Sequence, residues 1–286
     1  MKKVLIVTAD DFGAAVPINE AVEAAHTRGV LSAASLMVGG PAATDAVERA
    51  RRLPALGVGL HMTLTDGRPV LPPERIPGLV GRDGRFPRDP VGFGIALFFS
   101  RAMRRQAEAE IEAQFERFRE TGLVLDHING HQHFHMHPVV TRVIARLAPS
   151  FGSPPVRLPV EPFHPSWRAT ADRPLQRLAS WLFNMVQTRP MRRRFSAAGL
   201  EFNDSVFGLN DSGAMIEQRV LSFLDHLPEG ITELYCHPAT GRWEGPDNLP
   251  RDYRPEEEFA ALTSPKVRAR IESIGLHPLS FRKAVA

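Results

Sequence analysis

Short runs of β-forming residues alternate with helical patterns along most of this 286-residue chain, and this alternation limits the folds it can adopt. Strands that alternate with helices form parallel sheets or barrels, because each helix returns the chain to the same edge of the sheet. The pattern therefore predicts an α/β fold. The predicted strands are 3–9, 31–38, 57–64, 124–128, 156–159 and 232–238, and the predicted helices are 17–29, 42–53, 106–122 and 138–148.

Two segments, at about 66–105 and 160–215, interrupt the alternation. Both are too long to be plain connections in a compact domain, so we predict that they form lids, substrate walls or inserted helices. A chain of this length fits one large α/β domain or two small ones. We expect a single domain over residues 1–286 that carries these two insertions.

Composition excludes several classes of protein. Net charge is only +3, and no basic patch is interleaved with aromatic residues, so we expect no nucleic-acid partner. The single cysteine, Cys236, rules out a disulfide framework or a cysteine zinc site within one chain. No apolar run approaches the roughly 20 residues of a spanning helix, and the first residues are typical of a strand rather than a signal peptide. We therefore expect a cytoplasmic protein.

Polar side chains stand where several predicted strands end. Asp10 and Asp11 follow the first strand, His61 lies near the end of 57–64, and His237 lies near the end of 232–238. In parallel α/β folds, active sites gather at the carboxyl ends of strands. Neighbouring side chains on a strand point in different directions, so the two aspartates can divide the work between a metal and a proton. The alternatives are a helix-capping or turn pair for the aspartates and a structural role for His61.

Five of the eleven histidines fall within HINGHQHFHMHP, residues 127–138. A strand presents every second side chain on one face, so an extended segment would present His127, Asn129 and His131 together. The other histidines would lie in the loop and helix start beyond. Neutral imidazole is a common metal ligand, and unpaired buried imidazoles are costly. The run therefore favours a metal or carboxylate partner over the alternative, a solvated polar loop.

One aspartate and two histidines form a metal site with open positions, which suits Zn²⁺, Fe²⁺ and similar ions and tolerates Mg²⁺. Such an ion acidifies water and polarises a carbonyl. Asp10 as a base and His237 as an acid would complete a hydrolase. A catalytic thiol at Cys236 is the weaker alternative, because nothing nearby in the sequence would lower its pKa.

The segments TADDFG (8–13), GVGLHMTLT (57–65), HINGHQHFHMHP (127–138) and CHP (236–238) resemble, in order and spacing, motifs of the YdjC-like carbohydrate deacetylases. This family includes the ChbG chitooligosaccharide deacetylases. The resemblance implies a distorted (β/α) barrel, distantly akin to the NodB-type polysaccharide deacetylases. It also implies removal of an acetyl group from an N-acetylated sugar with one divalent metal ion, for which Zn²⁺ or Mg²⁺ is expected.

Carried over by position, Asp11, His61 and His131 match the metal ligands of the family. Asp10 matches the general base, and His237 matches a histidine that can act as general acid.

The chain departs from the family pattern beside these ligands. Asn129 replaces an aspartate and Gly130 replaces a serine, which puts metal preference and pH optimum in doubt more than reaction type. We also predict supporting positions around the metal ligands for His127, Asn129 and His133. Arg157 is predicted to contact the substrate.

Three further segments, 34–54, 68–80 and 210–215, resemble the hopanoid-biosynthesis branch of the family, HpnK. That resemblance implies an N-acetylglucosaminyl hopanoid as substrate. Independently, the apolar runs within 91–105 and 178–195 each precede an arginine cluster. This design suits peripheral contact at the inner face of a membrane, and the alternative is a pair of lid helices packed on the barrel. A homo-oligomer is compatible with the sequence.

We therefore predict a metal-dependent deacetylase that acts on an N-acetylated glycan or glycolipid, with a glycosylated hopanoid preferred and a chitooligosaccharide as the alternative. A metal-dependent phosphoesterase is a second possibility, but such sites usually hold two or three metals. A non-catalytic module that binds metal or glycolipid is a third, and it would need neither Asp10 nor His237.

Overall fold

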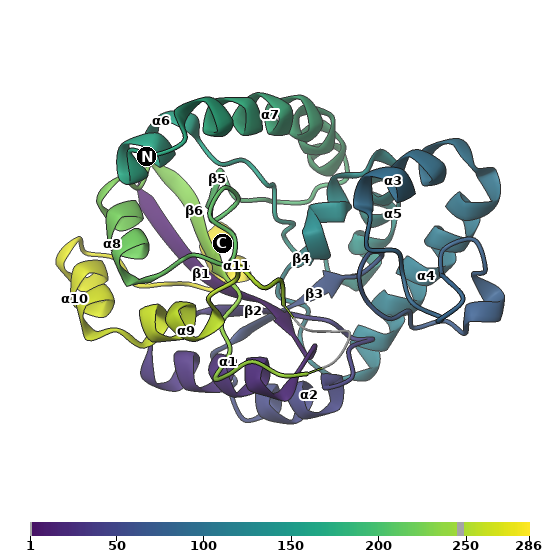
Figure 1. Ribbon diagram of the computed structural model, residues 1–286, viewed down its shortest axis with the longest axis horizontal. Coiled ribbons are helices and arrows are strands. Elements are labelled where there is room, and N and C mark those ends of the chain that lie inside the picture. The colour runs from purple at the N-terminus through teal and green to yellow at the C-terminus, as the bar shows by residue number, and fades with distance from the viewer. Residues whose placement is uncertain (1, 245–248) are drawn as a thin grey trace.

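A parallel sheet of six strands organises the molecule, and it curls into an incomplete barrel (Figure 1). The structure is a computed structural model, and it describes residues 2–244 and 249–286. The strand order is β4-β3-β2-β1-β6-β5. The α/β barrel expected from the sequence is confirmed. The strands are β1 (Lys3–Phe12), β2 (Ala33–Leu36), β3 (Gly57–Met62), β4 (Ile128–Gly130), β5 (Ser205–Phe207) and β6 (Gly230–Cys236).

The two edges of the sheet are joined by an irregular segment, residues 155–160. Val156 forms single parallel bridges to Ile128 on one side and to Phe202 on the other. The prediction of a strand over 156–159 was therefore wrong in extent, because only this one residue pairs on both sides. Prolines at 155 and 159 lack the N–H that a continuing strand would donate. The result is the distorted closure that the family resemblance implied.

Helices cover the outside of the sheet and fill the two long segments (Figure 1). The segment 66–105 contains a short 3₁₀ turn, all of α3 and the start of α4, whereas 160–215 contains α6, α7 and β5. The helices are α1 (Val16–Arg28), α2 (Ala43–Arg51), α3 (Pro90–Phe99), α4 (Arg101–Glu120), α5 (Pro138–Leu147), α6 (Phe163–Thr170), α7 (Pro174–Ala197), α8 (Glu217–Asp225), α9 (Pro255–Thr263), α10 (Pro265–Ser273) and α11 (Phe281–Val285), with 3₁₀ turns η1 (Pro73–Arg75), η2 (His131–Met136) and η3 (Ala148–Phe151).

Two element boundaries differ from the prediction for local reasons. Helix α4 begins at Arg101 rather than at 106, because the Ser100 hydroxyl accepts a hydrogen bond from the Met103 N–H and caps the helix. Strand β4 covers only three residues and begins at Ile128, at the end of the predicted strand 124–128. Within the described residues, no helix is long and apolar enough to cross a membrane.

One contiguous hydrophobic cluster lies between the sheet and its helices. Strand β1 is buried from Leu5 onward, and Ile111, Phe115 and Phe118 of α4 pack into the same cluster on the predicted face. Burial of each such aromatic ring stabilises the fold by roughly 1.5–3 kcal/mol. Because all strands run in parallel around this core, the carboxyl ends of β1, β3, β4 and β6 meet at one end of the barrel.

Candidate metal centre and active site

Strand β1 carries both aspartates to this end of the barrel, where its backbone is irregular. The register between β1 and β2 shifts between Ala9 and Phe12, and Asp11 has a φ of 63°. Neighbouring side chains of a regular strand point to opposite faces, but a bulge re-aims them. Here both Asp10 and Asp11 line one pocket.

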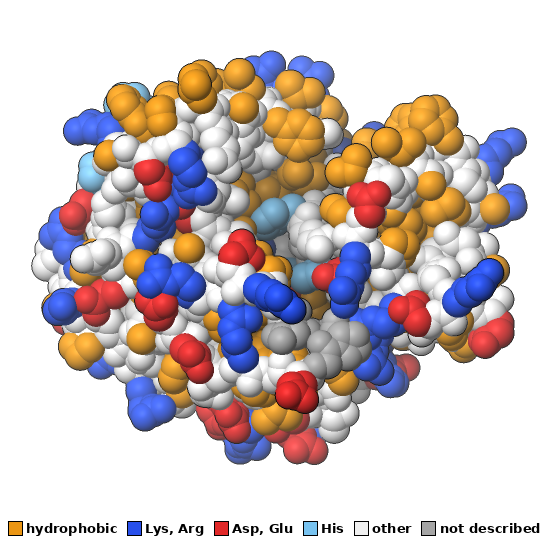
Figure 2. All heavy atoms as spheres, in the orientation of Figure 1, with side chains coloured by type: hydrophobic (Ala, Val, Ile, Leu, Met, Phe, Trp, Pro, Cys, Tyr) orange, Lys and Arg blue, Asp and Glu red, His pale blue; other side chains and the backbone are white. Residues whose placement is uncertain are grey.

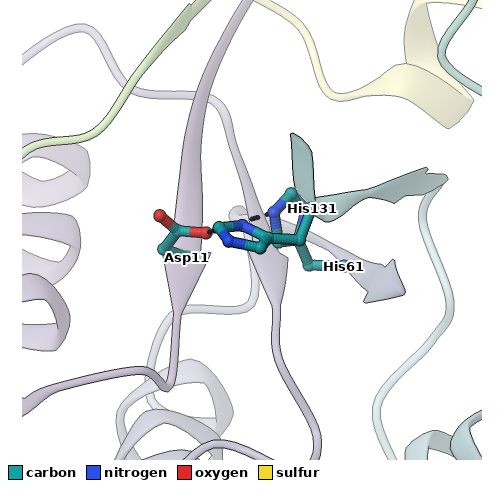
Figure 3. Close-up of side chains that lie close together, drawn as sticks. All are labelled: Asp11, His61 and His131. Carbon is teal, nitrogen blue, oxygen red and sulfur yellow. Dashed lines mark hydrogen bonds and ion pairs between the residues drawn. The ribbon is translucent and has the colours of Figure 1, made fainter. Parts of the chain in front are cut away.

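Asp11, His61 and His131 converge from β1, β3 and the residue after β4 (Figure 3). One ligand atom of each lies within 4.8 Å of the others. Asp11 Oδ1 is 3.2 Å from His61 Nε2 and 3.0 Å from His131 Nδ1. Atoms that share a Zn²⁺ at roughly 2.1 Å lie about 3.0–3.4 Å apart in octahedral or tetrahedral geometry. The three side chains therefore have the donor types and spacing of a divalent-metal site.

Asn129 determines which ring nitrogen of His61 carries the hydrogen and which can accept or bind a metal ion. The Asn129 Nδ2 donates to Asp10 Oδ1 at 3.2 Å and to Ser35 Oγ at 2.8 Å. The Asn129 Oδ1 therefore faces His61 Nδ1, at 2.7 Å, and this nitrogen must carry the hydrogen because an amide oxygen only accepts. His61 Nε2 then presents a lone pair to Asp11 Oδ1. Two acceptors at this distance are unfavourable unless a cation or a proton lies between them, so the residues fit a metal ion.

His131 is the most exposed member of the group, with a side chain 17% exposed against 4% for Asp11. Burial by itself lowers the pKa of His131, but the Asp11 carboxylate outweighs it and the pKa is raised. Burial likewise opposes ionisation of Asp11, yet His131 and His61 hold its pKa well below the ordinary value. Asp11 is therefore a carboxylate at neutral pH, and a proton on His131 competes with a metal ion.

A buried arginine binds the carboxylate of Asp10 from inside the barrel. Arg157 donates to Asp10 Oδ2 at 2.5 Å and to Asp10 Oδ1 at 3.0 Å, and it donates to both oxygens of Glu233 at 2.5 and 2.8 Å. Burial alone would raise the pKa of Asp10, but Arg157 and then His61 hold it far below the ordinary value. Asp10 is therefore an ionised carboxylate with a fixed orientation.

The predicted substrate contact of Arg157 does not fit this position. Its side chain has no exposed surface and does not line the pocket. Its guanidinium nitrogens are instead bonded to Asp10 and Glu233. The side chain points into the barrel from the irregular segment that joins the sheet edges, a placement that the sequence pattern did not reveal. Arg157 therefore orients Asp10.

A pocket of about 270 Å³ opens around the two aspartates, and Figure 2 shows histidine side chains within this hollow. The volume is close to the lower end for small-molecule sites, which suits a small group such as one sugar. Asp11, His61 and His131 lie on its wall, together with the polar residues Asp10, His133 and His237. The apolar residues on its wall are Ala14, Ile18, Met37, Pro41, Leu209, Leu249 and Pro250.

His237 follows β6 and faces this pocket. Its ring centroid lies 5.5 Å from that of Tyr235 and 5.1 Å from that of Tyr253. Burial lowers the pKa of His237, and the nearby aspartates offset this only in part. Its Nδ1 is buried with no hydrogen-bond partner among the described residues. A neutral imidazole in this position can bind a substrate group or exchange a proton with it.

Two other histidines of the run 127–138 lie near the ligands. His127 is fully buried, with Nδ1 3.1 Å from Asp126 and Nε2 3.0 Å from Ser35, which in turn binds Asn129. His127 is therefore connected to the candidate ligand His61 through Ser35 and Asn129. His133 lines the pocket with Nε2 3.2 Å from the Tyr235 hydroxyl. Burial and then Arg157 hold the pKa of His133 well below the ordinary value, so it is neutral.

The last two histidines of the run bind backbone carbonyls. His135 Nε2 lies 3.0 Å from the carbonyl of Arg157, and His137 Nε2 lies 3.1 Å from that of Gly94. Neither lines the pocket. Their roles are therefore structural, in the turn that follows β4.

A family model described as "YdjC-like protein" matches residues 4–273. The chain belongs to this family. A carbohydrate deacetylase from Geobacillus stearothermophilus is 32% identical over 99% of this chain and 98% of the relative, and one from Mus musculus is 35% identical over 95% and 92%. A chitooligosaccharide deacetylase from Salmonella paratyphi C is 30% identical over 98% and 99%. The crystal structure of a candidate cellobiose-phosphate cleavage protein from Enterococcus faecalis matches with a TM-score of 0.76 at 25% identity, over the whole of both chains.

The pocket of this YdjC-like chain contains polar residues that the sequence alone did not single out, and Tyr235, Ser212 and Tyr253 are among them. The hydroxyls of Ser212 and Tyr253 lie 2.7 Å apart. The alternation of β6 was the available signal, because it places Glu233 and Tyr235 on the same face as His237. Cys236 points the other way into the hydrophobic cluster, where burial raises the pKa of its thiol well above the ordinary value.

Glu258 of α9 supports His237 from within the protein. It is fully buried and accepts hydrogen bonds from the backbone N–H groups of His237 and Met215. Burial raises the pKa of Glu258 from 4.5 to about 7, although both N–H groups favour the ionised form. A titration of this carboxyl therefore falls within the range where stability is easily measured.

We expect Glu258 to make the stability of the fold depend on pH. Because its pKa is higher in the folded state, the stabilisation is complete below pH 4.5 and is lost as pH rises through 7, by about 3 kcal/mol in total. Glu258→Gln removes this titration. Urea unfolding of both proteins should show a stability difference that changes between pH 4.5 and 7. A difference that is constant with pH would contradict the assignment.

Proposed function

We propose that the protein is a metal-dependent hydrolase that removes the acetyl group from an N-acetylglucosaminyl substrate. The observation that carries the proposal is the convergence of Asp11, His61 and His131 in a pocket that Asp10 and His237 also line. Relatives named as carbohydrate and chitooligosaccharide deacetylases support the same reaction.

The two aspartates have different tasks in this proposal. A divalent ion held by Asp11, His61 and His131 would supply a Lewis acid that acidifies water and polarises the acetyl carbonyl. Asp10 accepts the proton of the attacking water. The ion pair with Arg157 keeps Asp10 ionised but makes it a weaker base, so its contribution depends on its fixed orientation.

His237 serves the leaving group. As the amide C–N bond breaks, the amine nitrogen needs a proton, and His237 on the pocket wall can donate one. Because His237 is neutral at rest, it takes up this proton from solvent before the transfer, and Asp10 returns the proton of the attacking water to solvent. The lowered pKa of His237 makes the protonated form a comparatively strong acid, which favours transfer to the amine. The products are acetate and the free amino sugar. The hydroxyls of Tyr235 and Ser212 are available to hold the sugar ring.

We further propose that the amino sugar is attached to a hopanoid lipid. Support comes from the segments 34–54, 68–80 and 210–215, which resemble the hopanoid-biosynthesis branch, and from the apolar part of the pocket wall at Leu209, Leu249 and Pro250. A chitooligosaccharide is the second candidate, favoured by the Salmonella relative.

Acetate release by metal-reconstituted protein tests the reaction and the substrate together. We expect release from an N-acetylglucosaminyl hopanoid and little from chitobiose. Release from chitobiose alone would keep the chemistry and exclude the lipid. No release from either substrate with Zn²⁺, Mg²⁺, Mn²⁺ or Co²⁺ would contradict the deacetylase proposal. In that case two or more metal ions per chain would favour a phosphoesterase.

A further inference from the structure

Over residues 174–188, helix α7 has the opposite polarity to an ordinary surface helix. Its buried residues there are Arg177, Asn184 and Thr188, whereas its outward face carries large hydrophobic side chains. Beyond Thr188 the helix buries the apolar side chains of Met191 and Phe195. A surface helix normally buries its apolar stripe and exposes its polar one. These outward residues recur at positions i, i+7, i+8 and i+11, on one side of the helix. We call Leu175, Leu182, Phe183 and Val186 the α7 face, and their side chains are 52–81% exposed.

Two of the inward polar residues of α7, Arg177 and Thr188, have partners within the protein, so the helix is not simply misplaced. Arg177 forms ion pairs with Glu161 and Asp211 and a further pair with Asp172. The Thr188 hydroxyl donates to the Asn184 carbonyl. Because this ion-pair network fixes the orientation of the helix, the α7 face cannot turn inward without breaking buried ion pairs.

Helix α3 presents a second apolar surface. None of its ten residues is charged or carries a polar side chain, yet only Phe93 and Leu97 are buried. We call its outward residues, Val91, Ile95, Phe98 and Phe99, the α3 face; they are 49–76% exposed. Figure 2 shows hydrophobic side chains gathered over α7 and over α3, on either side of the hollow that contains the histidines.

Arginines follow both apolar faces in the sequence, and neither of the two segments that contain them has an acidic residue. Arg101, Arg104 and Arg105 follow α3, and residues 90–107 contain no aspartate or glutamate. Residues 173–200 also lack acidic residues, and Arg189 and Arg193 continue the outward side of α7. A hydrophobic surface bordered by arginines is complementary to an anionic bilayer, whose acyl chains take the apolar groups and whose headgroups take the cations.

We propose that the α3 face and the α7 face together dock the protein on an anionic lipid bilayer, with the pocket between them. This would let a membrane-embedded glycolipid present its sugar to the pocket. The inference deepens the proposed glycolipid reaction and rests on it for its purpose, but bilayer binding can be measured without turnover. A second copy of the chain fits less well, because a twofold contact through these faces would bring the arginine clusters of both copies together.

Sedimentation with vesicles tests the docking directly. We expect the wild-type protein to bind vesicles of phosphatidylcholine mixed with phosphatidylglycerol and to bind phosphatidylcholine vesicles weakly. The triple variant Leu182→Ser, Phe183→Ser and Val186→Ser should lower the affinity for mixed vesicles by about tenfold or more. The double variant Arg189→Gln and Arg193→Gln should lower it by about tenfold and weaken its salt dependence.

Val124→Ser is the matched control. Val124 is 74% exposed, but it precedes β4 and so lies towards the amino end of the strands, away from the pocket. This variant should bind vesicles like the wild type. The triple variant should also keep the wild-type rate on any soluble N-acetyl sugar that is cleaved, because its residues do not line the pocket.

The possible failures are distinguishable. Wild-type protein that binds neither vesicle, or a triple variant that binds as well as Val124→Ser, would overturn the docking proposal. Light scattering that shows a wild-type dimer and a monomeric triple variant, with equal vesicle binding, would assign the faces to self-association and also overturn it. Vesicle binding that depends on the α7 face, with no acetate release from any substrate, would leave the docking proposal intact and reject the deacetylase.

Discussion

Replacing Asp10 with asparagine is expected to lower kcat/KM for deacetylation by about 10²–10⁴-fold while the metal content stays unchanged. Asparagine has nearly the same shape, but it cannot accept a proton from water. It can still bond to Arg157, whose charge remains paired with Glu233, so the fold should persist. Acetate release and elemental analysis of the purified variant measure the two effects separately.

Asp45→Asn provides the matched control for this substitution. Asp45 is also an ion-paired aspartate, but its partner Arg49 lies on α2 and neither residue lines the pocket. Its asparagine variant should retain full activity. Near-normal turnover by Asp10→Asn would rule out Asp10 as the base and leave its carboxylate with an electrostatic or structural role.

Replacing His131 with alanine is expected to reduce metal content from about one ion per chain to a small fraction of that. Two ligands then remain in place of three, and metal affinity falls by well over the 10–100-fold typical of losing an outer-shell partner. A bound ion also stabilises the fold, so adding metal should raise the Tm of wild-type protein but not that of the variant. Elemental analysis and thermal unfolding thus test the ligand role without an activity assay.

His137→Ala is the control within the same histidine run. His137 binds the Gly94 carbonyl and does not line the pocket, so this variant should keep its metal. Full metal occupancy in His131→Ala would show that another side chain takes the ligand position. His133 is then the candidate, because it lines the pocket, whereas His127 is fully buried between Asp126 and Ser35.

Local sequence signals predicted the regular elements well. Helix α1 ends before Gly29 as predicted, and the apolar face of α4 is buried as its spacing required. The predictions were poorer where the chain is irregular. Residues 156–159 form only one pair of bridges instead of a strand, because strand pairing depends on N–H groups that the neighbouring prolines lack.

The candidate site was predictable to the extent that it follows from topology. Parallel strands bring their carboxyl ends together, so polar residues that end β1, β3 and β6 had to lie near one another. The bulge at Asp11 was not predictable, because a positive φ at an aspartate follows from the packing around it. The ion pair between Arg157 and Asp10 was not predictable either, because 147 positions separate the two residues in the chain.

The sequence by itself determined the α/β class with parallel strands, the strand ends that carry polar side chains and the residue types of the candidate metal site, because these depend on periodicity and on neighbours along the chain. Only the tertiary structure decided that Asn129 orients His61, that Arg157 binds Asp10 rather than the substrate, and that α7 exposes large hydrophobic side chains over residues 174–188. Those features depend on which groups meet across the barrel. In each case a buried charge or hydrogen-bonding group must find its partner there, and this requirement overrides the local pattern.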